Sequence, residues 1–438
     1  MCPKLLFQVR YKHNRTIYKL FQIPLLKIAR KKEKIMFYLL GFLPFLWIHK
    51  TKLLQNRYQR KLNKLSSKSI INVGFLVREN CKWSYETLYK KLKENKRFNP
   101  VVLIVDEKHE VVDLKKNIEF FKKYNYCVIK NIRDFYKHDI DILFYEQPWF
   151  DLDGDFTPEN ISKTAITLYV PYDVGPDIAD DVVSICYDFY KALYKTFVIT
   201  DKMGDEFKSY SITNIMAVGH PRLDSYLTEV NKKNIIWKTT DKIRIIYAPH
   251  HSFGDSLHRW GSWEYNGDHI LKLAQENKKT TEWIFKPHPR FKFALTQLLG
   301  TKEKAQKVFD DWSKVSTIYD TGDYFDMFKT ADLMISDCWS FKIEWLPTCK
   351  PYIQLISNFK NRQAEGANVD YFSSAYYKAK KITDIDKYFY MLVRDHKDPN
   401  KEQRIALANE FELGATEKIY KFLIDFSYKK HTQDLKQF

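Results

Sequence analysis

The stretch IRIIYAPHHS, residues 243–252, joins a short run of β-branched and aromatic residues to a proline turn and two adjacent histidines. Such a run predicts a strand over Ile243–Tyr247, which the proline turn ends. The same pattern recurs in WIFKPHPR, residues 283–290, and in LMISDCWSFKIE, residues 333–344. Helix-like polar stretches separate these runs, so this part of the chain is predicted to form βαβ units around a parallel sheet.

Similar runs extend outward over the chain from residue 69, and they fall into two series. The expected strands are Ile71–Val77, Val101–Val105, Cys127–Ile129, Ile142–Tyr145, Ile166–Val170 and Phe197–Ile199 in the first series, and Met216–Val218, Ile243–Tyr247, Trp283–Phe285, Thr317–Tyr319, Leu333–Ile335 and Tyr352–Leu355 in the second. The fold class is therefore α/β, with two Rossmann-like domains. We expect an N-terminal acceptor domain over residues 69–217, a C-terminal donor domain over 218–400 and a helical segment over 401–438, with the change of sheet near Gly219.

The charge of the chain is concentrated at its N-terminus. The net charge is +18, and residues 1–70 hold seventeen Lys or Arg and one acid, Glu33. The remaining residues are nearly neutral, which argues against a nucleic-acid-binding face on the body of the protein. The six cysteines form no C-x-x-C pair. A zinc site or a disulfide framework is therefore not expected, and a reduced cytoplasmic setting fits better.

Within the basic segment, residues 35–48 form a run of fourteen apolar residues that contains Pro44. A spanning helix needs about 17–25 residues, so the run is short for a transmembrane segment. We interpret residues 1–68 as a basic, amphipathic helical extension that lies on an anionic inner-membrane surface. A helical extension packed on the body and a true span remain alternatives. The expected location is the cytoplasmic face of the cell membrane, as a peripheral protein.

Four loops that follow expected strands concentrate side chains able to bind an anion. The first is GHPRLD, residues 219–224, and the others begin at Ala248, Lys286 and Ser336. Because ligands bind beyond the carboxyl ends of parallel strands, these loops are expected to form one wall that holds a pyrophosphate. The candidate donor-binding residues are Arg222, Lys286, Arg290, Ser336, Asp337, Ser340 and Glu344, and the candidate catalytic histidines are His250, His251 and His288. Taken alone, each loop also fits a surface turn, a domain crossing or an ordinary helix start.

The order of these motifs resembles the CDP-glycerol glycerophosphotransferase family, the polymerases and primases of teichoic acids and capsules. The resemblance covers residues 165–360 and implies a GT-B-like pair of domains, a membrane-associated N-terminus and no cofactor or essential metal. It implies a CDP-glycerol or other nucleotide-diphosphate donor and a lipid-linked or polysaccharide acceptor. On this basis His288 contacts the donor pyrophosphate, and Ser336 and Ser340 supply hydroxyl donors to it.

One departure concerns the catalytic base. The family usually carries a His-Gly pair after a strand of the first domain, whereas this chain reads VPYDVGP over residues 170–176. Asp173 is a candidate base in that position, and His250 or His251 are the alternatives. The expected reaction is transfer of glycerol phosphate to a hydroxyl of a teichoic acid-like or capsular polymer, with release of CMP. The alternatives are a GT-B glycosyltransferase that uses a nucleotide sugar, a metal-dependent enzyme with an Asp-x-Asp motif, and a membrane adaptor without catalytic activity.

Overall fold

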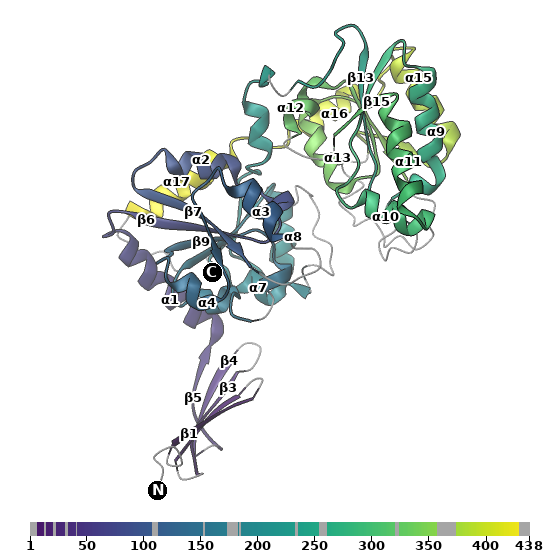
Figure 1. Cartoon of the computed structure of the whole chain (residues 1–438). Helices are drawn as coiled ribbons and strands as arrows, with labels where there is room; N and C mark the ends of the chain where they lie inside the picture. The colour runs from purple at the N-terminus through teal and green to yellow at the C-terminus, as the bar shows by residue number, and fades with distance from the viewer. Residues whose placement is uncertain are drawn as a thin grey trace.

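A computed structural model describes residues 7–12, 15–20, 23–30, 34–40, 42–106, 113–151, 154–172, 183, 185–232, 235–253, 261–319, 324–356 and 374–428. They form a small antiparallel N-terminal sheet and two larger parallel sheets (Figure 1). Helices cover each of the two parallel sheets. We call the seven-stranded parallel sheet with its helices the first domain and the six-stranded parallel sheet with its helices the second domain. The N-terminal sheet projects from the first domain on the side away from the second (Figure 1).

The N-terminal sheet contains five strands in sequence order, and each pairs antiparallel with the next. Helix α1 (Lys50–Leu65) follows them and buries one face, which includes Tyr58 and Leu62, on the first domain. The strands are β1 (Phe7–Lys12), β2 (Arg15–Leu20), β3 (Ile23–Arg30), β4 (Lys34–Leu39) and β5 (Leu43–His49).

The prediction of a helical extension is therefore wrong for residues 7–49. The apolar run 35–48 forms the β4–β5 hairpin, and a turn in which the Phe42 N–H donates to the Leu39 carbonyl lies between the two strands. Leu40 in this turn has a φ of 51°, which a helix does not allow. Pro44 would break a helix, but it is tolerated in β5 because that strand lies at the edge of its sheet. Among the described residues, no helix has both the length and the apolar character needed to cross a bilayer.

The first domain is built on a parallel sheet with the order β12-β11-β10-β9-β6-β7-β8. Its central strands are almost entirely buried because helices cover both faces, whereas the edge strands are partly exposed. The strands are β6 (Ile71–Val77), β7 (Phe98–Val105), β8 (Tyr126–Ile129), β9 (Ile142–Tyr145), β10 (Ile166–Tyr169), β11 (Lys195–Val198) and β12 (Ile215–Ala217), and the helices include α2 (Glu86–Lys93), α3 (Leu114–Phe121), α4 (Ile132–Tyr136), α5 (Pro158–Ile161), α7 (Tyr187–Ala192) and α8 (Asp201–Ser209).

The second domain has the parallel order β15-β14-β13-β16-β17-β18, so β13 lies between β14 and β16. The strands are β13 (Ile243–Ala248), β14 (Thr281–Phe285), β15 (Ser316–Ile318), β16 (Leu333–Ser336), β17 (Tyr352–Leu355) and β18 (Tyr377–Ala379), and the helices include α9 (Trp263–Glu276), α10 (Phe291–Leu299), α11 (Lys302–Ser313), α12 (Phe325–Thr330), α13 (Trp339–Trp345), α15 (Ile382–Val393) and α16 (Lys401–Ala408). Because these strands are parallel, the loops after β13, β14 and β16 all leave from one edge of the sheet.

The sequence groups Met216–Val218 with the second series of strands, and this grouping is wrong. Strand β12 pairs in parallel with β11 at the edge of the first sheet. The GHPRLD loop that follows β12 therefore leaves the first domain and does not belong to the edge that carries the other three motifs.

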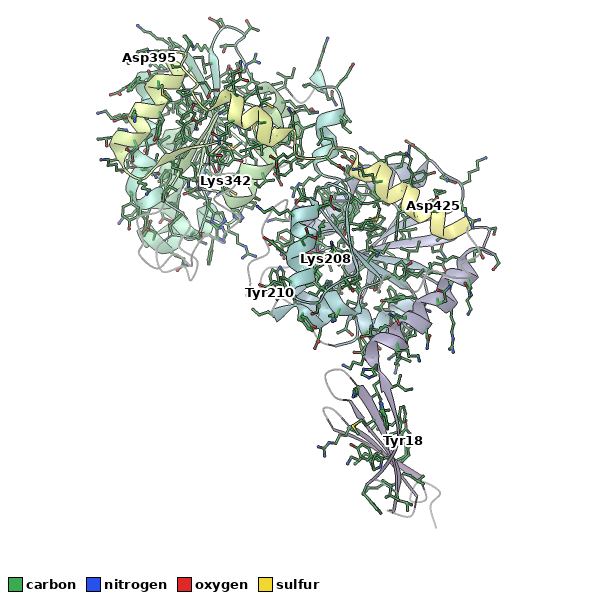
Figure 2. All side chains as sticks on the ribbon, turned by 180° about the vertical axis from the view of Figure 1, so that it is seen from behind. Tyr18, Lys208, Tyr210, Lys342, Asp395 and Asp425 are labelled. Carbon is green, nitrogen blue, oxygen red and sulfur yellow. The ribbon has the colours of Figure 1, made fainter. Side chains whose placement is uncertain are left out.

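The chain returns to the first domain at its C-terminal end. Helix α17 (Ala415–Tyr428) packs Ala415, Ile419 and Leu423 into the core of the first domain. Asp224 of the GHPRLD loop caps this helix, because its carboxylate accepts the N–H groups of Gly414, Ala415 and Thr416 at 2.6–3.1 Å. Figure 2 shows Asp425 of α17 over the first domain and Asp395 on the second. Two segments, one after β12 and one before α17, thus join the domains.

Candidate active site

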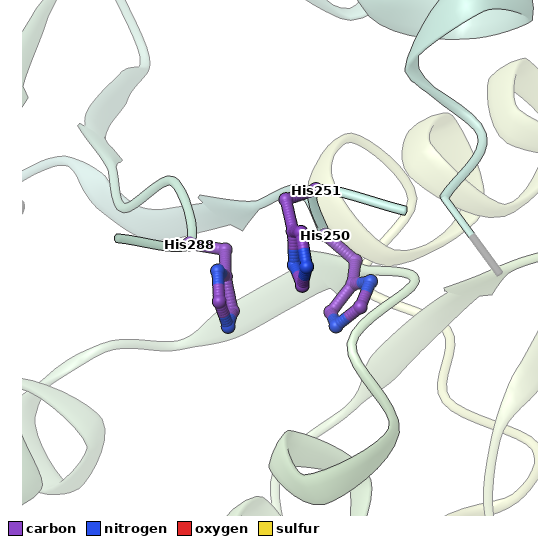
Figure 3. Close-up of side chains that lie close together, drawn as sticks. All are labelled: His250, His251 and His288. Carbon is purple, nitrogen blue, oxygen red and sulfur yellow. The ribbon is translucent and has the colours of Figure 1, made fainter. Parts of the chain in front are cut away.

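Three histidine rings meet at the carboxyl edge of the second sheet, and we call them the histidine cluster (Figure 3). His250 and His251 follow β13, and His288 follows the neighbouring strand β14. The ring centroids of His251 and His288 lie 4.0 Å apart in a stacked arrangement, and His250 lies 4.4 Å from His251 and 5.0 Å from His288. The N–H of His288 donates to the carbonyl of Pro249 at 3.1 Å and fixes the two loops together. The structure therefore brings all three histidines predicted from the sequence into one site.

Local hydrogen bonds set the tautomers of two of these rings. The Nδ1 of His250 accepts the N–H of Ser252 at 3.2 Å and lies 2.7 Å from the Ser252 hydroxyl, which can also donate to it, and the Nδ1 of His288 accepts the N–H of Arg290 at 3.1 Å. A neutral imidazole whose Nδ1 accepts a proton carries its hydrogen on Nε2. His250 and His288 therefore each present an Nε2–H donor. The Nδ1 of His251 is buried and has no hydrogen-bond partner among the described residues.

The histidine cluster is neutral at physiological pH. Burial lowers the pKa of His288 to about 2, with further lowering from His251, His250 and Arg290. Burial and the neighbouring His251 lower the pKa of His250 to about 3, and burial and Arg290 lower the pKa of His251 to about 4. Uncharged rings with fixed N–H groups act as directed hydrogen-bond donors, and they become more effective as negative charge develops on a bound phosphate.

The same three rings have a spacing that could surround a cation, since their candidate ligand atoms lie within 4.8 Å of one another. A histidine that ligates a metal usually donates its other ring N–H to a carboxylate or carbonyl oxygen. Here the Nδ1 atoms of His250 and His288 instead accept backbone N–H groups. The hydrogen bonds around the cluster thus favour an anion over a metal ion.

Asp337 holds the backbone of the histidine cluster in place through hydrogen bonds. Its carboxylate accepts the N–H of His250 at 2.6 Å, and it also accepts the N–H and the hydroxyl of Ser262 at 2.6 Å and 2.7 Å. Burial raises the pKa of Asp337 to about 6, although these hydrogen bonds oppose the shift. Asp337 therefore connects the loop after β13 to the start of α9, and its oxygens are occupied by protein donors.

The two serines of the β16 loop differ in their surroundings. The hydroxyl of Ser336 is fully buried, donates to the carbonyl of Ala248 at 2.5 Å and accepts the N–H of Cys338 at 2.9 Å. These bonds hold β16 to the end of β13 and leave the Ser336 proton directed at the backbone. Ser340 lies in the first turn of α13 with its hydroxyl 3.6 Å from the sulfur of Cys338. Of the two serines, Ser340 retains a partly exposed side chain.

The remaining basic residues of the predicted wall fall into two groups. Lys286 is buried among aromatic rings, and its Nζ lies 4.6 Å from the centroid of Tyr324 and 5.2 Å from that of Phe341. Arg222 lies over the same Tyr324 ring and pairs with Glu344 at 3.5 Å. Arg290 has a half-exposed side chain and belongs with the histidine cluster. Lys286, Arg222 and Glu344 thus form a largely buried group around Tyr324 that contains two positive charges and one negative charge.

Sequence reasoning missed an acidic residue of the first domain. Glu79 follows β6 and reaches the second domain, where its Oε2 lies 3.8 Å from the Nη2 of Arg290. Its signal in the sequence is an acid two residues after an expected strand, and polar residues after expected strands are also what identified the loops of the second series. Asp173, the base predicted from the family pattern, lies outside the described residues.

The lowered histidine pKa values predict acid sensitivity. The pKa of His288 in the folded state lies below its value in the unfolded chain, so the unfolded state binds more protons as the pH falls. The contribution of the neutral His288 to folding stability is therefore fully present well above the pKa of the unfolded chain, and it is lost as the pH falls through that value. When the pH is lowered from about 7.5 to about 5, His288 alone should lower the free energy of unfolding by on the order of 1–2 kcal/mol.

Denaturant unfolding of wild type and His288→Gln at both pH values measures this cost. The wild type should lose more stability than the variant, and the comparison cancels the opposite contribution of Asp337, whose raised pKa favours folding as the pH falls. Equal losses in the two proteins would show that His288 is not buried in its neutral form.

Comparisons with known proteins bear on the family and the fold of the chain. Residues 198–410 match the model of a family described as CDP-glycerol:poly(glycerophosphate) glycerophosphotransferase. The motif-based resemblance is thus confirmed, and so is the expectation that the chain is a transferase of this type. No curated protein matches the sequence.

Three solved structures that resemble the chain are distant from it in sequence. The wall teichoic acid polymerase TagF is 12% identical with a TM-score of 0.59, and the match covers 86% of this chain and 94% of TagF. UDP-GlcNAc 2-epimerase from Neisseria meningitidis, bound to UDP-GlcNAc, is 14% identical with a TM-score of 0.52 and covers 81% and 99% of the two chains. S. aureus MnaA with UDP is 12% identical with a TM-score of 0.53 and covers 82% and 98%. These likenesses confirm the predicted GT-B-like pair of Rossmann-like domains.

Proposed function

We propose, from the glycerophosphotransferase family match over residues 198–410, that this protein transfers glycerol phosphate from CDP-glycerol to a hydroxyl of a lipid-linked or growing cell-surface polymer. The polymer is teichoic acid-like or capsular, and the reaction takes place at the cytoplasmic face of the cell membrane. The observation that carries the proposal is the convergence of the neutral His250, His251 and His288 rings beside Arg290. That arrangement suits the diphosphate of a nucleotide-linked donor.

In the proposed reaction the acceptor oxygen attacks the β-phosphorus of CDP-glycerol. A new P–O bond forms to the acceptor, the P–O bond to the α-phosphate breaks, and CMP leaves with the electron pair. The Nε2–H groups of His250 and His288 stabilise charge on the phosphate oxygens, and Arg290 adds a positive charge at the rim. Asp337 acts indirectly by holding the His250 backbone in place.

A nucleotide-release assay tests the donor. The purified full-length protein is incubated with liposomes, a polymer acceptor and one donor at a time: CDP-glycerol, UDP-N-acetylglucosamine or a GDP-sugar. Release of CMP from CDP-glycerol alone is the expected result. Release of UDP or GDP would contradict the proposal in favour of a nucleotide-sugar glycosyltransferase, and loss of activity on chelation by EDTA would contradict the anion-binding role of the histidine cluster.

The N-terminal sheet supplies the membrane contact in this proposal. Its β4–β5 hairpin exposes large apolar side chains at its tip, with Phe42 67% exposed and Leu39 51% exposed, and Trp47 in β5 is 61% exposed. The surrounding segment carries the excess of lysine and arginine. Apolar side chains flanked by bases fit an anionic lipid surface, where insertion and charge attraction add.

Replacing Phe42 and Trp47 together by serine should weaken binding of the full-length protein to phosphatidylglycerol-containing vesicles by about tenfold or more. Co-sedimentation measures the effect, with phosphatidylcholine vesicles as the uncharged comparison. Phe293→Ser is the matched control, because this residue of α10 is 69% exposed on the second domain. If the double variant and the control bind vesicles equally well, the hairpin is not the membrane contact.

A further inference from the structure

A group of polar side chains lies at the carboxyl edge of the first sheet, and the transfer chemistry described above leaves it unused. Glu79 and Lys82 follow β6, and Glu146 and Gln147 follow β9. Strands β6 and β9 are parallel neighbours, so both loops leave from the same edge. Glu79 is 8% exposed, Glu146 2% and Gln147 1%, so three of the four are almost fully withdrawn from water. We call these four residues the Glu79 cluster.

Glu146 fixes the backbone of this cluster. One of its oxygens accepts the N–H of Arg78 at 2.8 Å and the N–H of Glu79 at 3.2 Å. Arg78 is itself held by two hydrogen bonds to the buried carboxylate of Asp151, at 2.8 Å and 3.0 Å. The loop after β6 is therefore anchored on both sides. A carboxylate carried by such a loop keeps one orientation, as a catalytic group requires.

The side chain of Glu79 divides its two oxygens between the two domains. Oε1 accepts the ammonium of Lys82 at 2.6 Å and the amide of Gln147 at 3.4 Å, both from the first domain. Oε2 lies 3.8 Å from the guanidinium of Arg290 in the second domain. Arg290 also donates its backbone N–H to His288. Oε2 thus lies beside a residue whose backbone holds one ring of the histidine cluster.

The histidine cluster offers poor alternatives for the base. His250 and His288 direct Nε2–H groups at the site, and a ring nitrogen that carries a hydrogen cannot accept another proton. The Nδ1 of His251 is buried without a hydrogen-bond partner among the described residues, and its ring stacks on that of His288 at 4.0 Å, so it is withdrawn into the cluster. A carboxylate of the first domain is the better candidate, because among its described contacts Oε2 of Glu79 has only the guanidinium of Arg290, at 3.8 Å, and can accept a proton.

We propose that Glu79 is the general base of the transfer reaction and that Lys82 and Gln147 beside it bind the polar acceptor. This inference rests on the proposed function. The acceptor O–H bond breaks as its oxygen bonds to the β-phosphorus, and the proton passes to Oε2 of Glu79. The bond from phosphorus to CMP breaks in the same displacement, and CMP takes its electron pair. When the donor diphosphate enters, it replaces Glu79 as the partner of Arg290 and leaves Oε2 to the acceptor hydroxyl.

Glu79→Gln should lower kcat by about 10²–10⁴-fold, the usual contribution of a general base. Its amide keeps the size of the side chain and can still accept from Lys82. The affinity for CDP-glycerol, measured by thermal shift and by KM, should change by less than about threefold, since Glu79 does not bind the donor. In Glu79→Ala, added formate should restore part of the rate, which a purely structural role would not allow. Glu119→Gln is the matched control, an exposed acid of α3 in the same domain.

Each outcome decides the proposal. A Glu79→Gln variant that keeps more than about a tenth of the wild-type kcat overturns it, because a general base contributes more than that. Equal losses of turnover and donor affinity, without rescue by formate, also overturn it and make Glu79 a structural residue. If the wild type uses a nucleotide sugar in place of CDP-glycerol, the proposed donor is wrong, and the same variants test Glu79 with the sugar donor. If the wild type releases nucleotide from none of the donors, both the proposed transfer reaction and the role of Glu79 are wrong.

Discussion

Replacing His288 by alanine is expected to lower kcat/KM for CDP-glycerol by about 10²–10³-fold, the usual cost of removing one fixed donor to a developing oxyanion. The reason is geometric. The backbone N–H of Arg290 holds the Nδ1 of His288, so the Nε2–H points at a fixed place beside His251. Water that fills the space left by the ring can donate a hydrogen bond but has no fixed direction. CMP release under steady-state conditions measures the loss.

Two further variants show which property of His288 matters. His288→Gln places an N–H donor near the same position and should recover part of the rate. His269→Ala is the matched control, because this histidine of α9 pairs with Asp386 at 2.6 Å and does not belong to the cluster. Near wild-type turnover of His288→Ala with every donor in the panel would mean that the pyrophosphate does not bind at the histidine cluster.

Much of the two parallel sheets can be predicted from the sequence. Strands β6, β9 and β17 begin and end at the predicted residues, and β13, β14 and β16 extend the predicted ranges by one or two residues. These strands are short, rich in β-branched and aromatic residues and buried on both faces. Their sequences are therefore apolar throughout, and they can be recognised as strands without any knowledge of their partners. Parallel order then places the histidine loops together, because it sends all carboxyl ends to one edge.

The N-terminal sheet could not be predicted in the same way. A run of fourteen apolar residues that includes Leu39, Gly41 and Pro44 shows neither clear helical nor clear alternating periodicity, and the flanking bases favoured a membrane helix. What decides the structure is pairing between strands that are neighbours in sequence, together with the turn at Leu40. Pairing energy between segments is not visible in the composition of either one.

The roles of individual polar residues were the least accessible to sequence reasoning. Ser336, Asp337 and Glu344 were predicted to bind the donor because they follow or flank β16. In the structure the hydroxyl of Ser336 bonds to backbone, Asp337 accepts three protein donors and Glu344 pairs with Arg222. A polar side chain after a strand is equally suited to a ligand and to a neighbouring loop. Only the position of the neighbouring N–H groups distinguishes the two.

Replacing Asp337 by alanine should lower the free energy of unfolding by about 3–5 kcal/mol, the range for a buried group that leaves several donors without partners. The N–H groups of His250 and Ser262 and the Ser262 hydroxyl all lose their acceptor. Because the His250 backbone is one of these donors, the histidine cluster should also lose its geometry. We therefore expect a fall in kcat/KM larger than the fall in stability alone would explain. Denaturant unfolding and CMP release measure the two effects.

The nature of the substitution separates this structural role from direct donor binding. Asp337→Asn keeps the size and one carbonyl acceptor, so it should retain the fold with an intermediate loss of stability, while its amide faces the donors of Ser262. Asp332→Ala is the matched control at the other end of β16, where the exposed carboxylate accepts only the N–H of Arg244 at 2.8 Å among its described hydrogen bonds. A stable Asp337→Ala protein with intact unfolding energy and weakened donor affinity would mean that Asp337 meets the substrate itself. Because its oxygens are already satisfied by three protein donors, we expect the opposite: loss of stability first, and loss of catalysis through the displaced histidines.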